Sequence, residues 1–246
     1  DNTRPNCDIP TPFYSHFVRV LHEFSVDASQ PRPSKAYYME RIKSTVSPVE
    51  ARCENTWNQH FGPGVIWKEV WQAVSSSWND PLLRDFDWRT IHRILPVNSR
   101  LHRWNYRMPE RCARCDARVE TLEHVLVYCP RIKELWMFVL SLCNRIDPSV
   151  VGFSEKTLLL GCLPRGHTHD LLRYLISVGK FSAWKERVSY QYKTNEKISC
   201  LVYFKNYVRL RLEMELSSLP MDAFLAKWAV NSVLVTRASD AVRILV

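Results

Sequence analysis

The sequence predicts a mainly α-helical protein, a multi-helix assembly built around one small segment in which cysteines cluster. Apolar residues recur at helical spacing along most of the chain. Glycine is scarce at six residues, whereas fourteen prolines punctuate the helical segments. Alternation at period two is confined to a possible hairpin around 110–119. At 246 residues, 46% of them apolar, the chain can bury a sizeable core.

Helices are expected in the first third of the chain at 11–24, 35–45 and 66–77, with loops at 29–34 and 61–64. The next segment, DFDWRTIHRIL, has a strong helical pattern. Asp85 or Asp87 is its expected N-cap and Pro96 its end, and a further helix begins after Asn98.

Residues 131–146, RIKELWMFVLSLCNRI, form an amphipathic helix by their spacing. Its apolar stripe consists of Ile132, Leu135, Trp136, Val139, Leu140 and Cys143. Long helices are expected at 170–187 and 198–215, and another opens with Pro220. These patterns suggest three segments, an N-terminal helical one (1–83), a central arginine-rich and cysteine-rich one (84–146) and a C-terminal helical one (147–246).

Residues 112–129, CARCDARVETLEHVLVYC, contain four candidate metal ligands at the spacing Cys112-x2-Cys115-x8-His124-x4-Cys129. Zinc takes four tetrahedral nitrogen and sulfur ligands, and a Cys-x2-Cys turn can aim two thiolates at one ion about 2.3 Å away. With all four positions filled by protein, the zinc would be structural. The alternative is a set of reduced, unligated cysteines beside a surface histidine.

The second pair of ligands requires a break in the helix. Thr121 is a good N-cap, which puts His124 in the first turn. On an ideal helix Cys129 would lie about 140° from His124, so a continuous helix could not present both to one ion. Pro130 disfavours helix at Cys129 and lets the chain turn that thiolate back. The fold class is therefore a multi-helix assembly around a small CCHC zinc-binding hairpin-helix.

The remaining cysteines lack metal-ligand spacing and are interpreted as small buried apolar residues. They are Cys7, Cys53, Cys143, Cys162 and Cys200.

The net charge of +9 comes from two stretches of the sequence. Residues 84–118 hold nine arginines and four acids, and residues 180–211 hold eight lysines or arginines and two acids. Such stretches favour a polyanionic partner, and arginine suits bidentate phosphate contacts. Trp104 or Tyr106 could stack on an unpaired base. The alternatives are a solvated basic surface for the charges and core packing for the aromatic rings. The candidate nucleic-acid contacts are Arg93, Arg100, Arg103, Trp104, Arg107, Arg111, Arg114, Lys180 and Lys185.

Several classes of protein are excluded or disfavoured. There is no GxGxxG or P-loop pattern, and no run of eighteen apolar residues that would span a membrane. The polar N-terminus is not a signal peptide. The missing initiator methionine suggests a piece of something longer.

In order along the chain, four stretches carry a resemblance: TWNQHFGPGVIWKEVWQAV, FDWRTIHRILPVNSRLHRW, CARCDARVETLEHVLVYCPRIKELW and VGKFSAWKERVSY. With YFKNYVRLRLEMEL and FLAKWAVNSVL after them, the sequence resembles the C-terminal part of a LINE-type, non-long-terminal-repeat retrotransposon reverse transcriptase across most of residues 12–235. The central block, with its Cys-Cys-His-Cys segment, is the most specific part.

The resemblance implies membership in an RNA–protein complex that nicks chromosomal DNA and primes reverse transcription from the nick. RNA, DNA and the remainder of the polyprotein would be its partners, with no membrane. Its location would be the nucleus, after cytoplasmic ribonucleoprotein assembly. The chain has no adjacent Asp-Asp pair for polymerase metals, so it is not expected to be an enzyme by itself. The alternative function is a domesticated protein-interaction module with an incidental basic surface; a nuclease lacks a convergent acidic set.

Overall fold

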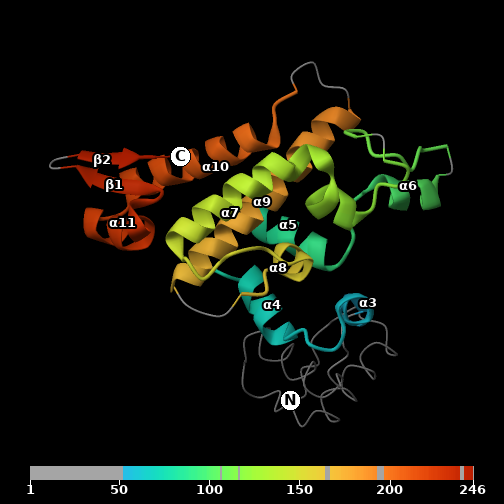
Figure 1. The fold of residues 1–246 in the computed structure, drawn as a ribbon, viewed down its shortest axis with the longest axis horizontal. Helices are drawn as coiled ribbons and strands as arrows, with labels where there is room; N and C mark the ends of the chain where they lie inside the picture. The colour runs from blue at the N-terminus through green and yellow to red at the C-terminus, as the bar shows by residue number, and fades with distance from the viewer. Residues whose placement is uncertain are drawn as a thin grey trace, which may run out of the picture. The chain divides into compact units, whose positions relative to one another are not determined.

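The computed structural model describes residues 52–105, 107–115, 117–163, 167–192, 197–238 and 241–245. The residues from Arg52 onward form one compact unit, which is mainly helical as predicted (Figure 1). Its elements are α3 (Arg52–Phe61), α4 (Trp67–Val74), α5 (Pro81–Ile91), α6 (Asn98–Trp104), η1 (His124–Tyr128), η2 (Pro130–Ile132), α7 (Lys133–Ile146), α8 (Glu155–Leu160), α9 (His167–Gln191), α10 (Cys200–Ser218), α11 (Met221–Trp228), η3 (Val230–Ser232), β1 (Val235–Ala238) and β2 (Ala241–Ile244).

The predicted helices at 11–24 and 35–45, the loop at 29–34, Cys7 and Tyr106 lie outside the described residues. Helices from all three predicted segments pack against one another within the compact unit, and the three-segment division itself stays a prediction. No helix among the described residues has the length and apolar content needed to cross a bilayer.

Six predicted helices lie close to their expected positions, as α4, α6, α7, α9, α10 and α11. The predicted stripe of α7 is buried except for half-buried Leu140. Helix α5 differs from the prediction, because its N-cap is Asp80, whose carboxylate accepts the N–H of Leu83 at 2.9 Å. Pro81 fixes the first helical position there, and the helix ends at Ile91, ahead of Pro96. The expected cap Asp87 instead lies buried inside the helix.

Strand structure also differs from the prediction. The loop at 110–119 forms two backbone hydrogen bonds, from Cys112 N to Ala117 O and from Glu120 N to Glu110 O, but no strand. Strands occur instead at the C-terminus, where β1 and β2 pair antiparallel with Val235 opposite Ile244. The strand sequences, VTRA and AVRI, do not alternate between apolar and polar residues, so period two gave no signal there.

Helix α9 is the centre of the packing, since α5, α7, η1 and α10 all contact it. Every residue from 171 to 180 is buried. Gly179 lets α7 approach closely, because a Cβ at this position would lie 2.8 Å from the Trp136 ring. The Trp136 indole in turn donates to the Leu126 carbonyl at 2.9 Å, so α7 also holds η1 in place.

Candidate metal centre and the surface around it

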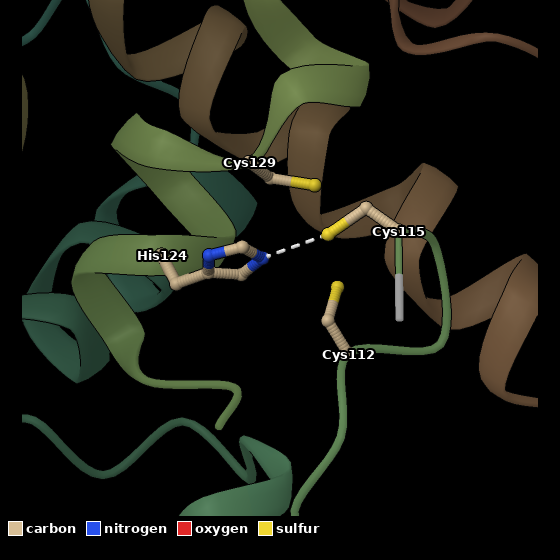
Figure 2. A group of neighbouring side chains, drawn as sticks. All are labelled: Cys112, Cys115, His124 and Cys129. Atoms are coloured by element: carbon tan, nitrogen blue, oxygen red, sulfur yellow. Dashed lines mark hydrogen bonds between the residues drawn. The ribbon is translucent and has the colours of Figure 1, made fainter. Parts of the chain in front are cut away.

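The four predicted ligands converge at one point, and Figure 2 shows their side chains facing one another. Their sulfur and nitrogen atoms all lie within 4.8 Å of one another. The Cys115 Sγ lies 3.3 Å from His124 Nε2. Cys112 and Cys129 are buried, whereas Cys115 and His124 are partly exposed. The sequence spacing therefore predicted the cluster correctly as a spatial group.

The first two ligands lie on a loop and the other two flank a short helix. The loop is closed by the hydrogen bond from Cys112 N to Ala117 O at 2.9 Å. Thr121 caps the helix as predicted, because its hydroxyl accepts the N–H of His124 at 3.1 Å. Cys129 leaves the helix with extended backbone angles, directly before Pro130 begins η2.

The way in which His124 and Cys129 reach one face differs from the prediction. The helix between them is a π-helix, closed by a hydrogen bond from Cys129 N to His124 O at 2.7 Å. A bond from residue i+5 to residue i places the two residues one above the other. The 140° separation expected of an ideal α-helix therefore does not arise, whereas the predicted end of the helix at Cys129, before Pro130, is confirmed by the extended backbone of Cys129.

The donor set fits a zinc ion. In a tetrahedral site with bonds of about 2.3 Å, neighbouring ligand atoms are roughly 4 Å apart, which agrees with the observed spread. The hydrogen bond between Cys112 and Cys129 lowers the pKa of the Cys112 thiol and raises the pKa of the Cys129 thiol, so the two sulfur atoms share one proton. Cysteine binds metal as a thiolate, and binding of a metal ion would release that proton. Four protein ligands leave no open position for water, as in structural sites.

Arg114, which lies between the two loop cysteines, points inward instead of toward solvent. Its side chain is fully buried, 3.4 Å from the Glu186 carboxylate on α9. It also donates to the carbonyls of Val125 at 2.7 Å and Ala183 at 3.0 Å. Arg114 was predicted to contact nucleic acid; its burial corrects that prediction and makes it a tie between the metal-binding loop and α9.

A second buried ion pair lies one residue further along α9. Arg187 donates to Glu120 at 2.7 Å and to the Asn98 side chain at 2.8 Å. The Glu120 carboxylate also accepts the backbone N–H of Asn98 at 2.9 Å. Charges are buried in proteins almost only when paired and hydrogen-bonded, and Glu120 meets this condition through Oε1, whereas its Oε2 has no hydrogen-bond partner among the described residues. This ion pair joins α6, the metal-binding loop and α9 at one point.

Lys180 requires a similar correction. This predicted nucleic-acid contact is 3% exposed, and its amine lies 2.7 Å from the Asp87 carboxylate on α5. The Ser177 hydroxyl donates to the other oxygen of Asp87 at 2.5 Å. Sequence reasoning did not identify Asp87, Glu120, Glu186 or Arg187 as interaction partners. For α9 the sequence did contain a signal of buried ion pairs, because the charged residues Glu186 and Arg187 occur in a largely apolar helix.

The other predicted contacts lie nearer the surface. Arg93 is half-buried, pairs with Glu123 at 2.5 Å and lies 4.3 Å from the centre of the Trp57 ring. Half-buried Arg100 lies 5.0 Å from the centre of the Trp104 ring. The exposed candidates are Arg103, Trp104, Arg107, Arg111 and Lys185.

Comparison with known proteins adds one finding. Residues 41–136 match the family model described as zinc-binding in reverse transcriptase. No curated protein and no solved structure matched the chain. The matched residues include the whole Cys/His cluster, so the region around the candidate metal centre is similar to a zinc-binding domain found in reverse transcriptases.

Proposed function

We propose that this chain is the nucleic-acid-binding accessory region from the C-terminal part of a LINE-type reverse transcriptase. In this proposal a structural zinc ion held by Cys112, Cys115, His124 and Cys129 fixes the loop that presents arginines to RNA or target DNA. The observation that carries it is the position of exposed arginines on α6 and on the loop closed by the four-ligand cluster.

The donor set supports zinc. Two cysteines on a loop, with a histidine and a cysteine at the two ends of a π turn, offer four donors, the number that a structural zinc takes. We expect close to one equivalent of zinc in protein purified without chelator, measured by elemental analysis. A fully folded protein free of metal would contradict the assignment.

Surface charge supports nucleic acid as the partner. Arg103, Arg107 and Arg111 are exposed on or next to the metal-binding loop, whereas Arg114 contributes to its interior. The second basic stretch offers less, because Lys180 is buried, Lys185 is exposed and Lys193 lies outside the described residues.

Charge reversal tests this surface. Binding to duplex DNA should weaken with salt at a log-log slope of about −0.9 per neutralised phosphate, and about −0.7 on single strands. Arg103→Glu with Arg107→Glu should lower affinity and flatten the slope while zinc content stays intact. The matched control reverses the exposed Arg237 and Arg243 on the C-terminal hairpin. Equal affinity and slope for the Arg103/Arg107 variant and wild type would remove these arginines from the site.

In the whole polyprotein, this region would help to hold RNA and target DNA during target-primed reverse transcription. It would act in the nucleus after assembly of a cytoplasmic ribonucleoprotein. The polymerase would lie elsewhere in the polyprotein, so the chain alone should not extend a primer. A primer-extension assay with Mg²⁺ checks this, and extension would contradict the accessory role.

A protein-interaction module is the second candidate, and one surface favours it. Tyr128 and Met137 are 58% and 63% exposed. They line an apolar groove with Trp136 and Phe153 beside Cys129. A mobility shift measured at several salt concentrations separates the candidates, since binding through this apolar groove would not require nucleic acid at all.

A further inference from the structure

We infer that the nucleic acid bound at this surface is unpaired, because the surface offers an aromatic ring for base stacking as well as cations for phosphates. This inference rests on the proposed nucleic-acid function and names the class of strand. Its centre is Trp104, at the C-terminal end of α6.

Trp104 is the most exposed tryptophan in the described part of the chain, at 68%. The exposed ring is accessible to a base, and stacking would remove apolar surface from water, which is favourable by roughly 25 cal/mol per Å². The guanidinium of Arg100 lies 5.0 Å from the ring centre, and Arg100 also donates to the Arg93 carbonyl. The indole is thus held beside an anchored cation while most of its surface faces solvent.

Two exposed cations that could contact a phosphate backbone flank Trp104 in the sequence. Arg103 precedes Trp104 and is exposed, and exposed Arg107 follows after a turn in which its backbone N–H donates to the Asn105 side chain at 3.1 Å. Phosphates are present on paired and unpaired strands alike, so these arginines do not discriminate between them. The ring does, because the faces of bases inside a duplex are covered by their neighbours, whereas an unpaired base can stack on an aromatic side chain.

A second aromatic group with cations lies nearby. Tyr190, near the end of α9, accepts a hydrogen bond from Arg131 at 2.7 Å, and the Lys197 amine lies 4.9 Å from its ring centre. The side chain of Asn98 at the start of α6 donates to Gln191 at 3.2 Å, so the end of α9 and the start of α6 adjoin (Figure 1). We assign Tyr190 with its two cations as a further contact for the same strand.

The experiment compares labelled single strands and duplexes of one sequence and length, as RNA and as DNA, by fluorescence anisotropy. Trp104→Leu should lower the single-strand affinity about tenfold, since stacking of one base contributes about 1–3 kcal/mol and a tenfold change corresponds to about 1.4 kcal/mol. Duplex affinity should stay within about twofold. Tyr190→Leu should produce a smaller loss of the same kind.

Trp88→Leu is the matched control. It makes the same change at a tryptophan that is 44% exposed on α5 and packs on His92, with ring centres 4.3 Å apart. This variant should bind both strands as the wild type does. Zinc content and helical signal should be unchanged in all three variants.

The outcomes separate this inference from the proposed function. If Trp104→Leu leaves single-strand affinity unchanged, or lowers both affinities equally, the inference is overturned while nucleic-acid binding stands. If the wild type binds neither strand, the proposed function itself fails. A selective loss of single-strand affinity supports the inference.

Discussion

Two parts of the molecule pack on α9 by different means. The metal-binding segment, residues 107–129, is tied to α9 by the buried pairs Arg114–Glu186 and Glu120–Arg187. The C-terminal segment, α10 to β2, packs on α9 mainly through apolar and aromatic side chains, such as Phe204 on α10. One interface is therefore directional and the other is largely hydrophobic.

The size of each segment explains the difference. The metal-binding segment is short, and its cysteines and charged residues leave few side chains that could build a core of their own. Directional ion pairs compensate for this, together with the metal cross-link proposed above. The C-terminal segment buries large rings instead, with Trp228 packed edge-on against Trp78 and Tyr174 at 5.3 and 5.5 Å between centres.

The matched family region ends at residue 136, within α7, whereas Glu186 and Arg187 lie on α9. Arg114 and Glu120 of the metal-binding segment thus find their ion-pair partners outside the matched region. Since a buried charge without its partner is strongly destabilising, α9 belongs to the structure that supports the metal centre.

Loss of a metal ligand should have the largest effect. Cys112→Ser or Cys129→Ser should abolish zinc binding and unfold residues 107–129, because structural zinc contributes apparent free energies of about 10–16 kcal/mol in small fingers. Hydrogen exchange should show α10 and α11 still protected. Cys162→Ser, outside the cluster and half-buried, is the control. A Cys112 variant that melts at the wild-type temperature with unchanged nucleic-acid affinity would refute the structural role.

Removal of the buried Trp228 ring should have the opposite effect: it should destabilise the C-terminal segment and leave zinc binding intact. Trp228→Ala should destabilise the protein by about 3–5 kcal/mol, because Trp228 is fully buried and the change leaves a cavity. Denaturant titration measures the loss, and zinc content should remain at the wild-type value. Trp88→Ala, at an exposed site, should stay within about 0.5 kcal/mol. Loss of zinc from the Trp228 variant would show that the stability of the metal-binding segment depends on the packing of the C-terminal segment.

The ion pair between Arg187 and Glu120 can be weakened by a substitution that keeps the positive charge. Arg187→Lys replaces a forked guanidinium that reaches both Glu120 and Asn98 with a single amine, so at least one buried acceptor loses its donor. We expect a loss of about 1–3 kcal/mol and faster hydrogen exchange in residues 107–129. Lys185→Arg, two residues earlier on an exposed position, is the matched control. An equal increase in hydrogen exchange in α10 would contradict the claim that this ion pair stabilises the metal-binding segment and not the C-terminal segment.

The sequence was sufficient for features that depend on local patterns. The stripe of α7 and the four-residue metal cluster follow from spacing, and Thr121 acts as the predicted cap. The direction of Arg114 and Lys180 was not predictable in this way. Each is buried because a partner far along the chain, Glu186 or Asp87, lies opposite it in the fold.

The π turn between His124 and Cys129 was also beyond pattern reasoning, because a calculation at 100° per residue assumes α geometry. The structure brings His124 and Cys129 to one face with a π-helix in place of an α-helix. Exposure resolved one ambiguity that the sequence left open, since Trp104 could equally have belonged to the core.

The smallest predicted effect concerns Glu215, the only charged residue that is buried among the described residues of the C-terminal segment. Its carboxylate accepts hydrogen bonds from Lys227 at 2.8 Å, from Trp228 at 2.7 Å and from Arg211 at 2.5 Å. Burial raises the pKa of Glu215, but these hydrogen bonds and the Arg211 charge outweigh it and lower the pKa overall.

The sign of the pH dependence follows. Because the folded-state pKa is below the unfolded value of about 4.3, Glu215 stabilises the fold fully above that pH, and the contribution is lost as pH falls through the folded pKa. Glu215→Gln should therefore be less stable than wild type at pH 7, by about 1 kcal/mol, because the charge is lost and the amide keeps only one of the two acceptor oxygens. The difference should shrink as the pH falls below about 4. Hydrogen exchange of α10 and α11 in both proteins measures it, and taking the difference cancels acid-induced metal loss, which affects both equally. A gap that stays constant down to low pH would mean that the Glu215 charge does not stabilise this segment, leaving it held by apolar packing alone.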